Sequence, residues 1–191
     1  LALTTSVQSM EQEPSKLYLE RLLKENPEFI NIMLISSTGQ EIVAVSRYEN
    51  IPRESLRWYG DDTEFKEALA GKRGQGYVVF EEGRPTLEIA VPVKRSPGDV
   101  AGVLAAKLDL RFLSEWLRQI KLGRTGVIYL VNRGGFIVAH SELPLATGGI
   151  QTLHFPSVAA VLQGQEVIPY GTGSRYQNLS GERVVAGAMP L

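Results

Sequence analysis

The sequence predicts an α+β fold in which an N-terminal helix precedes two similar domains, each built on an antiparallel sheet. Three observations lead to this prediction. Short β-type runs are separated by glycine-containing turns, short helical segments lie between these runs, and the order hairpin, helix, hairpin occurs twice. The 191 residues are enough for two small domains that each have a core.

The beginning of the chain has a helical pattern. Apolar residues from Leu3 to Met10 have helical spacing, and Pro14 is expected to end this segment. Ser15 is then expected to cap a second helix. We therefore assign residues 1–28 to an N-terminal helical segment.

The first sheet-containing domain is expected at residues 29–109. Asp61-Asp62-Thr63-Glu64 resembles a capping box that opens a short helix, and Gly71 closes this helix. β-Branched and aromatic runs predict five strands, at residues 29–35 and 41–45, on either side of Glu82-Gly83, and at residues 100–108.

A helix that connects the two domains is expected at residues 110–124. Asp109 comes directly before its first apolar residues and is expected to cap it. A ligand-binding role for this carboxylate is the less favoured alternative. Gly123 is expected to end the helix.

Residues 125–191 repeat the order of the first domain. The hairpin and the short helix recur, at residues 127–139 and 156–162. Residues 181–191 align without a gap on residues 83–93, with Gly, Ala and Pro at matching positions. Duplication explains this agreement better than chance does. Because the second copy would lack a counterpart of strand 100–108, we expect an incomplete second sheet with an exposed edge.

Composition excludes several classes of function. The sequence contains no cysteine, which excludes disulfides, thiolate zinc sites and cysteine nucleophiles. Its net charge is −1 and it has no basic face large enough to bind a nucleic acid. No apolar run approaches the ~20 residues of a membrane helix, so spanning segments of a parent protein would lie outside this chain.

Nothing in the sequence requires catalysis. His140 and His154 lie in different elements without nearby paired carboxylates, so we expect no metal site. No Ser, His and Asp set is placed to suggest a triad. We therefore expect no catalytic residues and no cofactor.

Four motifs together carry a resemblance to a known family. They are Gly83-x-x-x-Leu87-x-Ile89-Ala90-Val91-Pro92-Val93, Val100-Ala101-Gly102-Val103-Leu104 leading to Asp109-Leu110, Leu122-Gly123-Arg124-Thr125-Gly126, and Gly135-Phe136-Ile137-Val138-Ala139-His140. The ordered set resembles the double Cache sensor domains of histidine kinases, chemoreceptors and diguanylate cyclases, over nearly the whole chain.

The resemblance implies an architecture and a location. A long N-terminal helix would brace two tandem PAS-like folds, a membrane-distal one at residues 29–109 and a membrane-proximal one at residues 125–191. Both ends would lead to membrane helices absent from this chain, and the domain would be periplasmic or extracellular. The distal fold would hold a small-molecule ligand, and a homodimer is left open.

Lys107 is the first candidate for a ligand contact. Strand alternation places it on one face with Val103 and Ala105, where the small Ala105 leaves space beside the ammonium. Family members that bind amino acids carry an aspartate here, so the lysine reverses the charge. An anionic ligand, with a carboxylate favoured, is therefore expected. A lysine that merely extends from a strand edge toward water is the alternative.

The remaining candidates follow from the same resemblance. Tyr77 matches the pocket tyrosine of the family, and Phe65 is the aromatic residue that survives from the family's Arg-x-Trp-Tyr motif. Asp62 and Glu64 replace the arginine and the tryptophan of that motif, which puts amino-acid specificity in doubt. Further candidates near the expected pocket mouth are Arg47, Arg57, Trp58 and Tyr59.

Two of these candidates and one neighbouring residue have alternative interpretations. Trp58 and Tyr59 are more often loop-packing aromatics than walls of a ligand site. Glu88 shares a strand face with Thr86 and Ala90 and is expected to be solvated.

The sequence thus predicts a sensor domain that binds a small anionic metabolite and signals across a membrane. A histidine kinase is the first expectation for the output, followed by a chemoreceptor or a diguanylate cyclase. The alternative from another class is a dimerisation or interaction module that binds no ligand. An enzyme is the least favoured class, because nucleophiles and acid–base pairs are missing.

Overall fold

The computed structural model describes residues 5–96, 98–142, 150–165, 175–177 and 181–190. They divide into two compact units, the first within residues 1–81 and 85–110 and the second within residues 82–84 and 111–191. Leu3 and Leu191, used in the sequence analysis, lie outside the described residues. No helix in the described part of the chain is long and apolar enough to cross a membrane.

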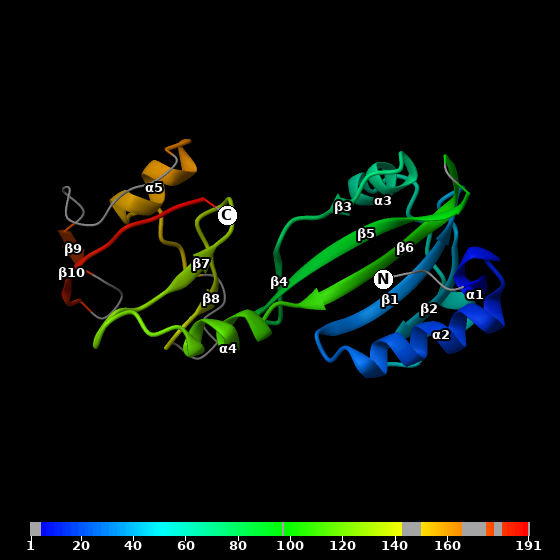
Figure 1. Cartoon of the computed structure of the whole chain (residues 1–191), viewed down its shortest axis with the longest axis horizontal. Helices are drawn as coiled ribbons and strands as arrows, with labels where there is room; N and C mark the ends of the chain where they lie inside the picture. The colour runs from blue at the N-terminus through cyan, green and yellow to red at the C-terminus, as the bar shows by residue number, and fades with distance from the viewer. Residues whose placement is uncertain (1–4, 97, 143–149, 166–174, 178–180, 191) are drawn as a thin grey trace. The chain divides into compact units, whose positions relative to one another are not determined.

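The first unit contains a six-stranded antiparallel sheet with helices on both faces (Figure 1). Its strands are β1 (Phe29–Ser36), β2 (Glu41–Ser46), β3 (Gly74–Gln75), β4 (Val79–Glu81), β5 (Arg84–Ser96) and β6 (Asp99–Asp109). Its helices are α1 (Thr5–Gln8), α2 (Gln12–Glu25), the short 3-10 helix η1 (Arg53–Ser55) and α3 (Thr63–Leu69).

The strand that comes last in this unit lies in the middle of its sheet. The strand order is β2-β1-β6-β5-β3, and β4 pairs with β5. Ala106 of β6 lies opposite Ile32 of β1 on one side and opposite Ile89 of β5 on the other. β6 therefore joins the β1–β2 hairpin to β5.

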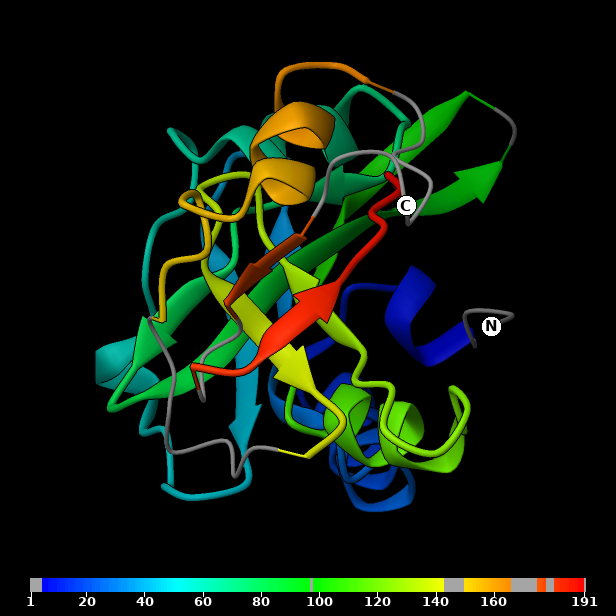
Figure 2. The ribbon, with the colours of Figure 1, turned by 90° about the vertical axis from the view of Figure 1, so that its left-hand side faces the viewer.

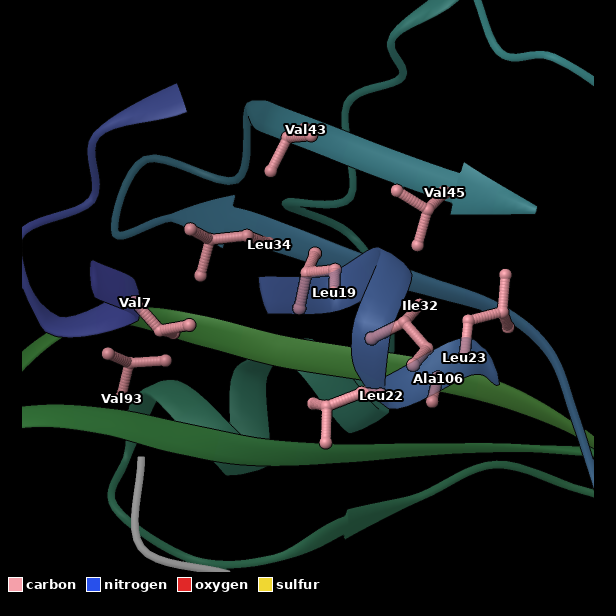
Figure 3. Close-up of a cluster of buried hydrophobic side chains, with 10 residues drawn as sticks. All are labelled: Val7, Leu19, Leu22, Leu23, Ile32, Leu34, Val43, Val45, Val93 and Ala106. Carbon is pink, nitrogen blue, oxygen red and sulfur yellow. The ribbon is translucent and has the colours of Figure 1, made fainter. Parts of the chain in front are cut away.

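Alternation along β6 sends its side chains to two different layers. Ala106 and Leu104 belong to the cluster under α2, where Leu19, Leu22 and Leu23 of that helix lie against the sheet (Figure 3). Val103 and Ala105 belong to the cluster on the opposite face, under α3. The predicted facing of these strand residues is confirmed.

The described part of the second unit contains two hairpins and two helices. The strands are β7 (Tyr129–Val131), β8 (Ile137–His140), β9 (Arg175–Gln177) and β10 (Arg183–Val185), and the helices are α4 (Phe112–Gln119) and α5 (Pro156–Leu162). β7 pairs with β8 and β9 pairs with β10, as separate two-stranded ladders. In Figure 2, α5 is orange and β10 is red.

The N-terminal helices break at a different place from the one predicted. The break falls at Ser9–Glu11, where Met10 has a positive φ of 61°. Pro14 lies in the first turn of α2, where a missing N–H costs no helical hydrogen bond. Ser15 is a buried residue within α2 and does not cap it.

Two further predictions about helix caps are wrong. Asp62 occupies the N-cap position of α3, but its side chain makes no capping hydrogen bond. α4 begins at Phe112 with Arg111 at the N-cap position, and Asp109 is the last residue of β6. Because the chain makes a turn at residues 110–111 between β6 and α4, Asp109 does not occupy the N-cap position although it precedes an apolar run.

Candidate functional site

A small hollow lies on the α3 face of the first sheet. Its apolar lining comes from β1, β5, β6 and α3, through Met33, Ile35, Phe65, Ile89, Ala90, Val103 and Ala105. The hollow measures about 270 Å³ when the solvent at its mouth is included, and its interior has room for about one water molecule. Ala90 and Ala105 lie opposite each other on β5 and β6, and their short side chains leave this space.

The polar lining of the hollow is acidic. It consists of Asp62, Glu64, Glu88 and Tyr59, and no Lys, Arg or His is among the described lining residues. Asp62 and Glu64 come from the start of α3, and Glu88 comes from β5.

Tyr59 supplies a neutral hydroxyl to the same wall. Burial, with the nearby charge of Glu41, raises the pKa of Tyr59 to about 12. The phenol therefore stays protonated at physiological pH, and its Oη lies 3.1 Å from the Sδ of Met33.

Lys107 lies next to the hollow and is already paired. Its Nζ is 2.7 Å from Oε1 of Glu81 on β4 and 3.4 Å from Oε1 of Glu88, which lies opposite it on β5. Burial by itself lowers the pKa of Lys107, but the hydrogen bond to Glu81 and the charge of Glu88 outweigh burial and raise it. The ammonium stays charged, and two carboxylates neutralise it.

The other predicted site residues fall into two groups. Tyr59 and Phe65 line the hollow. Tyr77 and Trp58 do not line it, since their side chains are 79% and 57% exposed. The Arg57 side chain is exposed as well, and the backbone of this residue carries its contacts.

Arg47 fastens the end of α2 and is not among the lining residues of the hollow. Its guanidinium donates hydrogen bonds to the carbonyl oxygens of Leu23, Asn26 and Phe29. These carbonyls belong to the last turn of α2 and to the start of β1, so Arg47 ties the helix to the hairpin.

The acidic character of the hollow was not predicted from the sequence. Glu88 was expected to be solvated, and it is only partly so: its side chain is 34% exposed, pairs with Lys107 and lines the hollow. The residues beside Glu88 indicated that its strand face is covered. Its neighbours on that face are the uncharged Thr86 and the small Ala90, and both are 1% exposed. Glu81 could not be placed from sequence, because its pairing depends on the position of β4.

This arrangement suits binding. A hollow lined by apolar side chains and by acidic residues fits a molecule that has both a hydrocarbon part and a cationic group. The described residues contain no cluster of three or more His, Cys, Asp or Glu that could hold a metal ion. The described lining contains no nucleophile paired with a base.

Comparisons with known proteins relate this chain to sensors. A family model described as Cache domain, dCache_1, matches residues 1–191. No protein of curated function matches the chain significantly. The extracellular domain of the histidine kinase mmHK1S-Z2 superposes with a TM-score of 0.63 at 14% identity, over 96% of this chain and 78% of that one.

Two chemoreceptor domains are also similar in structure. The ligand-binding domain of the Pseudomonas aeruginosa chemoreceptor PctC, in complex with GABA, has a TM-score of 0.53 at 20% identity, over 78% of this chain and 67% of that one. The Pseudomonas fluorescens chemoreceptor CtaA, in complex with L-serine, has a TM-score of 0.52 at 20% identity, over 79% of this chain and 66% of that one. At these identities the likeness concerns the fold.

Proposed function

The chain belongs to the Cache-domain family and is an extracytoplasmic sensor domain, and we propose that it binds a small organic molecule in the hollow under α3. We further propose that the ligand carries a protonated amino group. The observation that carries this proposal is the hollow itself, whose lining combines apolar side chains with Asp62, Glu64 and Glu88.

Charge is the reason for preferring a cationic group. An anion would meet no cation in the described lining, and around the hollow the four carboxylates of Asp62, Glu64, Glu81 and Glu88 outnumber the single ammonium of Lys107. The two chemoreceptor relatives are described with GABA and L-serine, and both molecules contain an ammonium group. Recognition of a carboxylate by Lys107 is the alternative that follows from the sequence.

The wider assignment is also a proposal. Residues 29–109 would be the membrane-distal PAS-like fold and residues 125–191 the membrane-proximal one, joined by residues 110–124. Ligand binding would shift an existing equilibrium that is passed to membrane helices, with a histidine kinase as the favoured output. A chemoreceptor or diguanylate cyclase output is the alternative.

Thermal-shift screening tests the ligand class. Primary amines, amino acids and dicarboxylates are compared at equal concentrations, since a ligand at about 100 times its Kd stabilises a domain by about 2.7 kcal/mol. We expect amines or amino acids to raise the melting temperature and dicarboxylates to leave it unchanged. Stabilisation by dicarboxylates alone would instead support Lys107 as the anchor.

Variants on one helix provide the matched comparison. Glu64→Gln should weaken an amine hit about tenfold or more, because a charge-assisted hydrogen bond is lost. Glu67→Gln, an exposed residue of α3 that does not line the hollow, should leave its affinity unchanged. If no molecule of any class stabilises the protein, the interaction module without a ligand becomes the better assignment.

A further inference from the structure

The hollow is too small for a metabolite in the form described. Its interior has room for about one water molecule, whereas small-molecule sites usually enclose roughly 300–1,000 Å³. If the proposed function holds, one wall of the hollow must move when a ligand enters. The question is which wall can move without breaking the sheet.

Three of the walls are held firmly. β1 and β6 are central strands with ladders on both sides, and β5 pairs with β6 along most of its length. The rest of the lining comes from α3 and from the segment between β2 and α3, and this segment has only the short helix η1 as regular structure. This segment places Tyr59 in the lining.

The end of this segment is fastened to the β1–β2 turn by five hydrogen bonds. Three of them involve the backbone of Arg57: its N–H donates to Oε2 of Glu41 at 2.8 Å, and its carbonyl accepts from the N–H of Glu41 at 3.0 Å and from Nε2 of Gln40 at 3.2 Å. The other two run from the N–H of Tyr59 to the carbonyl of Gly39, at 2.8 Å, and from Nε1 of Trp58 to the carbonyl of Thr38, at 3.1 Å.

We propose that residues 56–60 form a lid over the hollow, with Tyr59 as its inner face and the Glu41 carboxylate as its latch. Glu41 is 5% exposed, so its carboxylate is an unusual group to bury beside a loop. It binds both backbone groups of Arg57, one through its side chain and one through its own N–H. This pairing extends the β2 edge by a residue that belongs to no strand.

Two glycines allow the lid to close tightly. A Cβ on Gly39 would lie 2.7 Å from the backbone nitrogen of Gly60, and Gly39 has a φ of +87°. A Cβ on Gly60 would lie 2.0 Å from the ring of Trp58. Gly60→Ala should therefore displace the Trp58 ring and weaken the hydrogen bond by which its Nε1 holds the lid to the carbonyl of Thr38.

Amide hydrogen exchange measured by NMR tests the lid without a ligand. In the wild type, the amides of Arg57 and Tyr59 should exchange at least about tenfold faster than those of β1 and β6, because the lid opens without global unfolding. Glu41→Ala should speed the Arg57 amide about tenfold further and leave β1 and β6 unchanged. Glu41→Gln, which keeps an acceptor oxygen, should stay within about threefold of the wild type.

Two controls keep the result unambiguous. Glu54→Ala, an exposed residue of η1, should change no rate. If Glu41→Ala unfolds the protein, Gly60→Ala serves in its place, and it should speed the amides of Arg57 and Tyr59 alone. The fluorescence of Trp58 in a Trp116→Phe background should change in parallel, because the chain has two tryptophans.

The lid is disproved if the Arg57 and Tyr59 amides exchange as slowly as β1 and β6 in the wild type. It is also disproved if Glu41→Ala speeds the whole first unit equally, because Glu41 would then be a general stabilising residue. Neither outcome depends on a ligand. Failure of the ligand screen would therefore contradict the proposed function and leave the lid to be judged by exchange.

Discussion

In the first unit one strand joins two hairpin regions into a single sheet, whereas the two hairpins described in the second unit are not paired with each other. β6 makes this join, because it pairs with β1 on one side and β5 on the other. Among the described residues of the second unit, no strand lies between β7 and β10. Two hairpins with strand-type alternation and turn glycines therefore form a single sheet here only where a further strand pairs with both of them.

The local features of the two units agree closely. α3 and α5 have seven residues each, and each is followed by a glycine with positive φ. The hairpin turns also match, since Gly39 and Gly135 have φ values of 87° and 74°, and Gly83 and Gly181 have 77° and 79°. The difference between the units thus lies in long-range pairing and not in their turns or helices.

The largest expected effect comes from a substitution in the core of the first unit. It tests whether that unit unfolds cooperatively and separately from the second. Leu34→Ala in β1 should lower the free energy of unfolding by about 2–5 kcal/mol, because the side chain is 0% exposed. Denaturant unfolding is followed by Trp58 in a Trp116→Phe background and by Trp116 in a Trp58→Phe background. The Trp58 transition should move further.

Phe155→Ala in the second unit is the reciprocal control. Its ring is 2% exposed and lies near that of Tyr129, so it should move the Trp116 transition further than the Trp58 transition. Equal shifts of both transitions by each variant would show that the units unfold as one body.

The next effect contrasts the ion pairs of the two units. Lys107→Met should cost about 1–3 kcal/mol, because it leaves Glu81 and Glu88 without a partner in a half-buried place. Arg118→Met in α4 should cost about 0–1 kcal/mol, since its partner Glu115 is 65% exposed. Chemical denaturation measures both, and Lys94→Met, an exposed residue of β5, is the neutral control. Equal costs for Lys107 and Arg118 would contradict the contrast.

A smaller effect tests the agreement of the turns. Gly83→Ala and Gly181→Ala should each cost about 1–2 kcal/mol, because both positions require the left-handed conformation that a Cβ disfavours. No atom lies within 4 Å of either added Cβ, so the cost is one of backbone conformation alone. Asn variants at both sites should recover part of the stability. Unequal costs would mean that the two turns are not equivalent.

The smallest effect is a pH dependence of opposite sign in the two units. Burial raises the pKa of Glu41 above its usual 4.5, so its contribution to stability falls as pH rises from 4.5 to the raised value. Burial lowers the pKa of His140 below its usual 6.5, so its contribution falls as pH drops from 6.5 to the lowered value. His140 also accepts a hydrogen bond from the N–H of Glu142 at Nδ1, which a proton there would break.

Stability measured against pH in matched variants isolates the two groups. As pH rises, the free energy of unfolding of Glu41→Gln should increase relative to that of the wild type. The transition reported by Trp58 measures this difference. His140→Asn keeps a hydrogen-bond acceptor near the same place. As pH falls, its free energy of unfolding should increase relative to that of the wild type, in the transition reported by Trp116. A gain in the same direction for both variants would refute the assigned signs.

The sequence was sufficient where a signal is local. The hairpin of β1 and β2, the helix α5 and the turn at Gly83 follow from alternation, helical spacing and glycine, and they are found as predicted. Caps were misjudged because residue type alone does not make a cap: the Asp62 side chain makes no capping hydrogen bond, and Asp109 lies two residues before the N-cap position of α4.

The candidate site depends on contacts that the sequence does not specify. Two of the predicted site residues, Tyr59 and Phe65, line the hollow, and a ligand contact by either stays a prediction. The neutralisation of Lys107 could not be foreseen, because it requires the register that sets Glu88 opposite it and the fold that brings β4 alongside. The anionic ligand inferred from this lysine stays a prediction that the thermal-shift screen will test.

The central place of β6 also sets the order in which the first unit can form. Residues 29–36 of β1 pair with residues 102–108 of β6, so the sheet depends on contacts between segments far apart in sequence. Chains rich in such contacts fold slowly, because loop-closure entropy is lost before the pairing compensates for it. The β1–β2 hairpin therefore waits with an open edge until β6 has been synthesised, and this interval is when the emerging chain is most exposed to aggregation.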